Sequence, residues 1–175
     1  DHNVLAGVFA IREARPALRD GGQLNRVTAH QVSGSFFGSL GVQPLLGRAI
    51  FPEDDKTGAA NRVTVLSYAL WSRRFGRSPS VIGANLRLFG ELFTVIGVMP
   101  EEFFGVDRSR VPDLWVPLAV DPSVAPVRAL NVAPLQRGPR ETFGDQARVV
   151  VERREQLPQR LRRLRVPRHP VDLAL

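Results

Sequence analysis

Short apolar segments separated by glycine and proline run through residues 32–118, and this punctuation limits the folds open to the chain. The 175 residues include 15 Gly and 14 Pro, which implies many turns. Frequent turns favour an α+β or β-rich chain over a bundle of long helices. A chain of this length suits one domain or two small ones and can bury a real core.

The strands are indicated by short runs of β-branched and aromatic residues between turn signals. We expect strands at residues 4–11, 26–32, 63–66, 85–89, 92–98 and 114–116. Gly90 and Glu91 lie between two of these strands and predict a tight hairpin. Glycine supplies the positive φ that such a turn needs.

Helices are indicated by capping residues at both ends of short amphipathic segments. We expect them at residues 35–40, 68–75 and 144–157. The first has Ser33 or Ser35 as its N-cap and Gly41 after its last turn. The second has Ser67 as its N-cap and Gly76 after its last turn. The third carries only an imperfect apolar stripe.

The net charge of +7 is concentrated in the last third of the chain. Of the 24 basic and 17 acidic residues, residues 126–175 hold 11 and 5, which leaves 13 and 12 for residues 1–125. The part with the short apolar segments is therefore nearly neutral. This balance argues against nucleic acid as its main ligand.

Catalytic motifs are missing from the sequence. The absence of Cys excludes disulfides, a thiol nucleophile and CxxC zinc sites. The only lysine, Lys56, follows Asp55, so there is no P-loop, and GxSxG does not occur. His2, His30 and His169 are far apart and lack HExxH spacing. We expect no enzyme activity and no catalytic, cofactor-binding or metal residues.

The strongest acidic cluster is Glu53, Asp54 and Asp55. A hard cation such as Ca²⁺ needs several oxygen ligands around a tight turn. The cluster lacks the remainder of a DxDxDG pattern, so a solvated loop or a helix start is the favoured interpretation.

Five aromatic residues, Trp71, Phe75, Phe103, Phe104 and Trp115, are interpreted as core anchors. Trp71 and Phe75 are four residues apart and share one helix face. Phe103 and Phe104 follow a proline on an expected loop, so a role in contacting a partner stays open.

The C-terminal segment is rich in arginine. It holds Arg153, Arg154, Arg160, Arg162, Arg163, Arg165 and Arg168. Nucleic acid phosphates or anionic lipid head groups are candidate ligands. The segment has no interleaved aromatic residues, and a solvated helix face or a disordered tail is favoured.

A series of short motifs occurs in a fixed order over about half of the chain. Its first half consists of Val32-Ser33, Phe36-Phe37, Leu40-Gly41, Pro44, Gly47-Arg48, Phe51, Glu53, Asp54 and Asp55. Its second half consists of Val63, Val65, Leu66, Ser67, Trp71, Phe75, Gly76, Ile82-Gly83, Leu86, Leu88, Gly90, residues 93–98, Pro100, Phe103, Gly105 and residues 113–118. This order and spacing resemble the periplasmic core domain of MacB-like permeases, in the FtsX-like class of ABC transporters.

The resemblance implies an α+β fold with a porter-like βαβ subdomain and an inserted small α/β-rich (Sabre-like) subdomain. It divides the chain into a core region at 1–120, a continuation of the porter half at 121–151 and an atypical Arg/Pro-rich tail at 152–175. No apolar run reaches the roughly 20 residues that span a bilayer. Residues 152–175 do not resemble the family, and we therefore expect a fragment whose porter half is incomplete at the C-terminus.

The implied function is that of an extracytoplasmic domain on the periplasmic face of the bacterial cytoplasmic membrane. It would relay ATP-driven motion of a permease to periplasmic substrate or partner proteins. The implied partners are the remainder of the permease and its ATPase subunit, with a periplasmic adaptor and a second copy of the chain as further candidates. The alternative is a stand-alone basic protein that binds nucleic acid or anionic surfaces through its Arg-rich tail.

Overall fold

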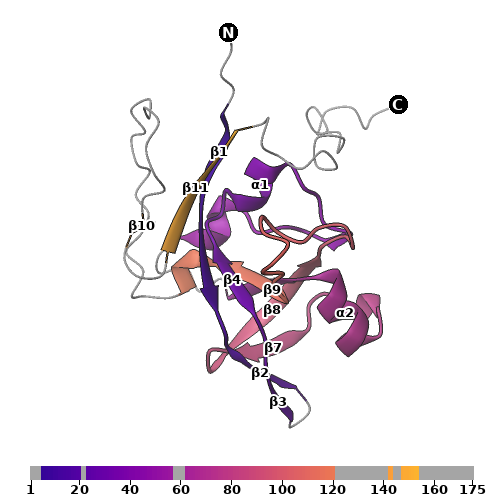
Figure 1. Cartoon of the computed structure of the whole chain (residues 1–175). Helices are drawn as coiled ribbons and strands as arrows, with labels where there is room; N and C mark the ends of the chain where they lie inside the picture. The colour runs from indigo at the N-terminus through magenta and orange to yellow at the C-terminus, as the bar shows by residue number, and fades with distance from the viewer. Residues whose placement is uncertain (1–4, 21–22, 57–61, 121–141, 144–146, 154–175) are drawn as a thin grey trace, which may run out of the picture.

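One mixed β-sheet organises the chain (Figure 1). The computed structural model describes residues 5–20, 23–56, 62–120, 142–143 and 147–153. Its strands are β1 (Leu5–Ala14), β2 (Ala17–Asp20), β3 (Gln23–Arg26), β4 (Ala29–Val32), β5 (Leu46–Gly47), β6 (Val63–Leu66), β7 (Asn85–Leu88), β8 (Glu91–Val98), β9 (Leu114–Pro117), β10 (Thr142–Phe143) and β11 (Ala147–Arg153). The helices are α1 (Phe36–Leu40) and α2 (Tyr68–Phe75), with 3₁₀ turns at Pro52–Asp55, Pro79–Val81 and Leu118–Val120. The expected α+β class is confirmed.

The order of the strands shows how the sheet is assembled. They run β10-β11-β1-β4-β9-β6-β8-β7-β2-β3, and β5 pairs with β8 outside this path. The pairs β4–β9 and β6–β8 are parallel, and the chain crosses between β6 and β8 through α2. The described strands thus form one continuous sheet. The division into a porter-like and an inserted subdomain stays a prediction.

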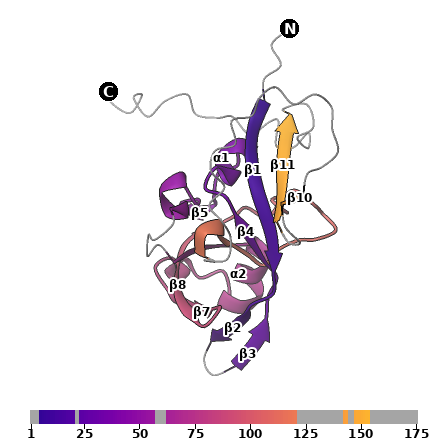
Figure 2. The same cartoon turned by 90° about the vertical axis from the view of Figure 1, so that its left-hand side faces the viewer.

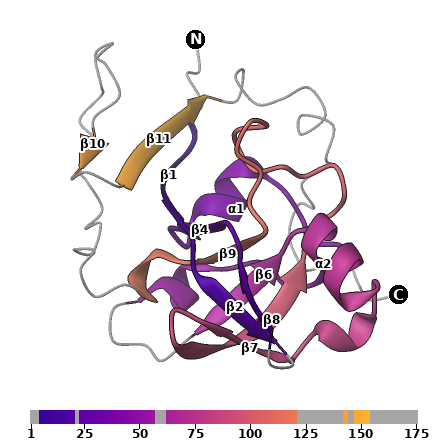
Figure 3. The same ribbon diagram turned by 60° about the horizontal axis from the view of Figure 1, so that its bottom comes forward.

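A long bent hairpin pairs with both outer strands of the group β9-β6-β8-β7. Its outward arm is β1 followed by β2, and its return arm is β3 followed by β4. At its far end β2 pairs with β7, while at its near end β4 pairs with β9 (Figure 3). The sheet therefore curves back on itself through this hairpin.

The bend in the hairpin interrupts the single strand expected at residues 26–32. Proline at position 16 has no N–H to give to the ladder, and β1 and β2 are separated there. On the return arm β3 ends at Arg26 and β4 begins at Ala29. The N–H of Val27 still donates to the carbonyl of Pro16 at 3.1 Å, so the two arms stay connected across the bend.

The helix expected at residues 144–157 is wrong, because residues 147–153 form strand β11. This strand pairs antiparallel with β1, from Leu5 opposite Arg153 to Arg12 opposite Ala147 (Figure 2). The run Val149–Val151 is β-branched and favours a strand wherever an edge is free to pair. The imperfect apolar stripe of the sequence had suggested the wrong period. The ladder also extends to Arg153, inside the segment assigned to the tail.

Two hydrophobic cores lie on opposite faces of the sheet. Strand periodicity divides neighbouring side chains between them, so that Val65 joins the first core and Leu66 the second. The first core contains Phe9, Ile11, Val32, Phe36, Phe37, Leu40, Val42, Ala49, Ile50, Val63, Val65, Met99, Phe103 and Trp115. The second contains Leu18, Val27, Ala29, Leu66, Leu70, Trp71, Val81, Leu86, Leu88, Phe93, Val95, Val98, Leu114 and Val116.

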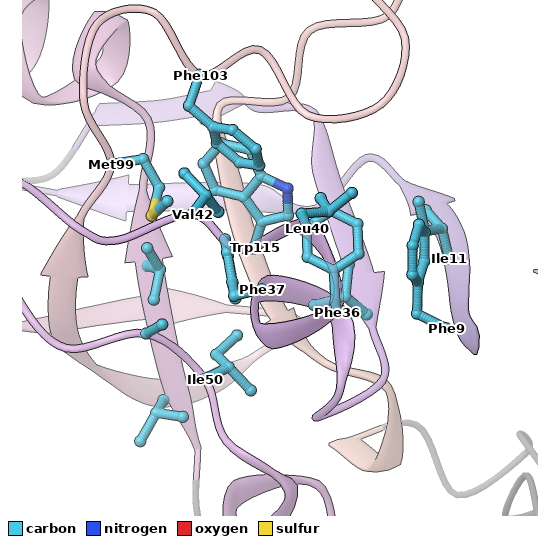
Figure 4. Close-up of a cluster of buried hydrophobic side chains, with 14 residues drawn as sticks. Phe9, Ile11, Phe36, Phe37, Leu40, Val42, Ile50, Met99, Phe103 and Trp115 are labelled. Atoms are coloured by element: carbon cyan, nitrogen blue, oxygen red, sulfur yellow. The ribbon is translucent and has the colours of Figure 1, made fainter. Parts of the chain in front are cut away.

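A chain of aromatic rings links β1 to β9 through α1 in the first core (Figure 4). Phe36 lies edge-on to Phe9 and to Phe37, with both centroid distances at 5.0 Å. Phe37 and Phe103 both contact Trp115, at 5.8 and 5.3 Å. Edge-to-face pairs at such distances add to the stability from burial alone. The core roles of Phe103 and Trp115 are confirmed.

The ends of both helices follow the capping signals in the sequence. Gly41 and Gly76 take the left-handed conformation, with φ of 64° and 55°. The N–H of Leu70 donates to Ser67 Oγ at 3.1 Å, so the predicted N-cap of α2 is confirmed. Ser35 stands at the N-cap of α1, but its side chain makes no capping bond. Ser33 Oγ instead accepts the N–H of Ala10 at 3.0 Å and so ties α1 to β1.

The turn between β7 and β8 lies one residue earlier than predicted. It is formed by Phe89 and Gly90, with φ of 53° and 83°, and Glu91 begins β8. Two consecutive positive φ values are typical of a type I′ hairpin turn. Gly90 fits this conformation easily, whereas Phe89 is an outlier for a bulky residue.

Glycine is required where β5 crosses β8. Gly47 lies opposite Gly97, and a Cβ on either residue would come within 2.2 Å of a backbone oxygen. Gly47 also has φ of 68°. The two glycines of the motif series therefore mark a close approach of two backbones.

Trp71 in α2 gives a direct test of the second core. Its ring is buried, and its Nε1–H donates to the carbonyl of Ser78 at 2.8 Å. Trp71→Ala should lower the free energy of unfolding by about 3–5 kcal/mol, because it removes a large buried ring and leaves a cavity. Urea melts measure the loss. Phe75→Ala, which removes a half-buried ring on the same helix, should cost less, and a loss under about 1 kcal/mol for Trp71→Ala would contradict the account.

Candidate functional site

The acidic cluster forms a clamp between three segments of the chain. Asp54 is buried, and its carboxylate receives Arg48 Nη1 at 2.6 Å and Nη2 at 2.9 Å. The N–H of Phe51 donates to the same carboxylate at 2.9 Å. Asp55 accepts the N–H of Gly34 at 3.0 Å and that of Ala119 at 2.7 Å. Three segments, at Gly34, at residues 48–55 and at Ala119, are thus held around two carboxylates.

The pKa values of Asp54 and Asp55 are shifted in opposite directions. Burial would raise the pKa of Asp54, but the hydrogen bonds from Arg48 and the Phe51 N–H outweigh it and hold the pKa below its usual value. Burial raises the pKa of Asp55, because the N–H donors of Ala119 and Gly34 only partly compensate. Both carboxylates are engaged by N–H donors, so they act as structural acceptors in this conformation. Among the described residues, no group of His, Cys, Asp or Glu is arranged to hold a metal ion.

A second clamp is centred on Asp113, just before β9. Its Oδ2 accepts the N–H of Thr28 at 2.9 Å, and its Oδ1 receives Arg73 Nη2 of α2 at 2.5 Å. Its backbone bonds to Thr28 and to Ser67 as well. One residue therefore fixes the start of β4, the start of α2 and the start of β9 relative to each other. The sequence placed Asp113 in a motif, but only the folded chain reveals this role.

The remaining candidates for chemistry have structural positions. His30 is buried in β4 opposite Glu13, and burial lowers its pKa despite the nearby carboxylates of Glu13 and Asp107. His2 and His169 lie outside the described residues. Phe104 is half-buried and lies under the guanidinium of Arg108 at 5.3 Å, so its role as a core anchor is only partly confirmed.

The basic tail contributes one described residue. Arg153 ends β11, and residues 154–175 lie outside the described part. An anion-binding tail therefore stays a prediction. Over the described ranges, no helix is long and apolar enough to cross a membrane.

The profile of one protein family, the MacB-like periplasmic core domain, matches residues 3–156. The chain belongs to this family. Its resemblance in sequence is thereby confirmed, and the family is one of periplasmic domains of ABC transporter permeases. No curated protein matches the chain.

Solved structures agree with the fold of this MacB-like domain. The periplasmic region of MacB from Actinobacillus actinomycetemcomitans aligns with a TM-score of 0.52 at 17% identity, over 68% of this chain and 51% of that one. The extracellular domain of the noncanonic ABC-type transporter YknZ from Gram-positive bacteria aligns with a TM-score of 0.57 at 17% identity, over 87% of this chain and 68% of that one. The MacB-like domain thus spans about half the length of the MacB periplasmic region. At these identities the comparison establishes the fold.

The motifs of the MacB-like domain supply residues to the two clamps and to both hydrophobic cores. Arg48, Asp54 and Asp55 meet in the first clamp, while Asp113 and Ser67 meet in the second. The motif residues therefore position loops against the sheet.

Asp54→Asn tests the first clamp through its pH dependence. At pH 7 the variant should lose about 1–3 kcal/mol of unfolding free energy, because the buried acceptor of Arg48 and Phe51 loses its charge. A carboxyl with a lowered folded-state pKa stabilises the native state above its unfolded pKa of about 4, and this contribution disappears as the pH falls through the folded-state pKa. The difference between wild type and variant should therefore shrink at acidic pH in urea melts.

Glu101→Gln serves as the matched control, because Glu101 is exposed. It should change the unfolding free energy by no more than about 0.5 kcal/mol. A difference between wild type and Asp54→Asn that stays constant from neutral to strongly acidic pH would contradict the clamp.

Proposed function

We propose that this domain relays the ATP-driven motion of an ABC transporter permease to proteins or substrate outside the cytoplasmic membrane. The observation that carries the proposal is the pairing of β1 with β11. Leu5 lies opposite Arg153, so the two ends of the described fold leave side by side at one end of the molecule. The β2–β3 hairpin lies at the opposite end of the long arm (Figure 1). Movement applied at the paired ends would be carried to the far end of the sheet.

A relay needs a body that moves as one piece. The ladder between β1 and β11 joins both ends of the domain over most of the length of β1. The clamps at Asp54, Asp55 and Asp113 fix the loops and α2 to the same sheet. Hydrogen bonds to charged groups are among the stronger polar contacts in proteins, and here they cross-link segments far apart in sequence. The domain would therefore rotate or shift as a rigid unit.

The proposed partners follow from membership in a permease family. We expect the remainder of the permease and an ATPase subunit to supply the motion, and a periplasmic adaptor or a second copy of the domain to receive it. We do not expect an enzymatic role, because the acidic groups of the motif series, Asp54, Asp55 and Asp113, are engaged in the clamps. We place the domain on the periplasmic face of the cytoplasmic membrane.

Spin labels test the relay directly, and the absence of Cys in this chain gives a clean background for them. Asn25→Cys labels the far hairpin and Glu101→Cys labels an exposed loop of the same domain. In the reconstituted parent permease with its ATPase, a trapped nucleotide state should move the Asn25 label relative to a label on a membrane segment by about 2 Å or more. The distance between the Asn25 and Glu101 labels should stay unchanged.

An ATPase variant that cannot bind nucleotide is the control, and adding nucleotide to it should leave both distances unchanged. If the Asn25 label keeps its distance from the membrane segment in every nucleotide state, the relay is refuted. A change confined to the two labels within the domain would refute the rigid-body form of it.

A further inference from the structure

A row of four exposed side chains crosses the outer face of the sheet at its far end. Strand register aligns them: Leu24 of β3 lies opposite Arg19 of β2, Arg19 opposite Arg87 of β7, and Arg87 opposite Leu92 of β8. All four are exposed, Leu24 at 64% and Leu92 at 52%. We call these four residues the arginine row.

The inward neighbours show that this face is turned away from the second core. Leu18, Leu88 and Phe93 alternate with the members of the row and are buried. The row thus follows from period-2 alternation on three strands that line the core. Two large apolar side chains nevertheless occupy the outer positions, which ordinary alternation would fill with polar residues.

Two positive charges lie at the centre of the row, on directly opposed residues of neighbouring strands. Arg19 and Arg87 face each other, and like charges directly opposite on a sheet are destabilising. Within the described part of the chain, Arg19 has no acidic partner and Arg87 donates only to the carbonyl of Gly90, at 2.9 Å. Glu91, which begins β8, is paired with Arg62 at 3.7 Å. Arg26 adds a third exposed cation on the same face of β3.

The hairpin tip beside the row also departs from an ordinary turn. Phe89 is 43% exposed and has φ of 53°. A bulky residue in the left-handed region costs free energy, and such outliers cluster where a surface has a function. The ring of Phe89 lies 6.1 Å from that of Phe93 in the second core, so it covers the edge of that core next to the row and does not extend the row itself.

We propose that the arginine row is the docking site for an acidic amphipathic helix of a partner protein. Adjacent strands are about 4.8 Å apart, and a helix repeats every 5.4 Å along its axis. A helix lying across the strands therefore presents one side chain per strand, with acids over Arg19 and Arg87 and apolar residues over Leu24 and Leu92. An extended segment repeats one face every roughly 6.7 Å and fits the row less well.

The choice of a protein over a lipid surface rests on the proposed function. If the paired ends of β1 and β11 lead toward the membrane, the β2–β3 hairpin faces away from it. The row is then out of reach of lipid head groups. An anionic bilayer would otherwise satisfy the same cations and leucines.

The test uses the purified chain and a labelled, stapled alanine-based peptide with Leu, Glu, Glu and Leu at positions i, i+4, i+7 and i+11. Fluorescence anisotropy at low salt should show saturable binding that Arg19→Glu weakens about tenfold, since a cation that meets a carboxylate becomes a repelling acid. Arg77→Glu makes the same change of charge at an exposed site outside the row and should leave affinity within about twofold. A peptide with Gln in place of both Glu should bind weakly.

Thermal melts give a readout that a merely structural arginine would not produce. Arg19→Glu should raise Tm by about 1–3 °C, because it converts a repelling cross-strand pair into an attracting one. Loss of binding together with a gain in stability supports the proposal. A lowered Tm with unchanged binding overturns it.

Three further outcomes also overturn the proposal. Equal losses for Arg19→Glu and Arg77→Glu would indicate attraction by overall charge. Equal affinity for the Gln peptide would show that the two arginines do not recognise carboxylates. Binding to vesicles of phosphatidylglycerol and phosphatidylcholine that depends on Arg19, without peptide binding, would assign the row to a lipid surface. This experiment does not contain the permease. A negative result for helix binding therefore leaves the proposed relay untouched, and a negative result for the relay leaves helix binding untouched.

Discussion

The bent hairpin of β1–β2 and β3–β4 is the feature on which the rest of the structure depends. One arm supplies a partner to β11 and to β7, and the other arm pairs with β9. Both edges of the strand group from β9 to β7 are therefore paired by the same stretch of chain. The hydrogen bond from Val27 to Pro16 keeps the arms together where the ladder breaks. Without this hairpin the strands from β9 to β7 would have two open edges, and each core would lose the buried side chains that the hairpin supplies.

The curvature explains why the polar groups act as clamps. A strongly bent sheet leaves its loops on the outside of two separate cores, where apolar contact alone would hold them loosely. Asp54, Asp55 and Asp113 fix these loops through backbone N–H groups and two arginines. Burial of the Asp55 carboxylate has a desolvation cost, which raises its pKa. The clamps thus connect the loops and α2 to the sheet.

Local features of this fold could be predicted from the sequence, whereas its long-range pairings could not. The bounds of α2 and the roles of Ser67 and Gly76 follow from short-range capping chemistry, and the structure confirms them. The error at 147–153 arose because a β-branched run with a weak helical stripe is decided by whether an edge such as β1 is available. The roles of Asp113 and of the arginine row depend on register between distant strands, which no local pattern specifies. The family was nevertheless recognisable, because its motifs are the local turns, caps and glycine crossings that this register requires.

Native-state hydrogen exchange tests most directly the claim that the domain is one rigid unit closed by the hairpin. The account predicts that the slowest amides of β1, β4, β6, β8 and β9 share one opening free energy equal to that of global unfolding, and that the protected amides of β2 and β7 belong to the same unit. A separate opening of β2 and β7 at a much lower free energy, while β4, β6 and β9 stay protected, would contradict it. In that case the far hairpin would move independently of the sheet, and motion entering at β1 would not reach it.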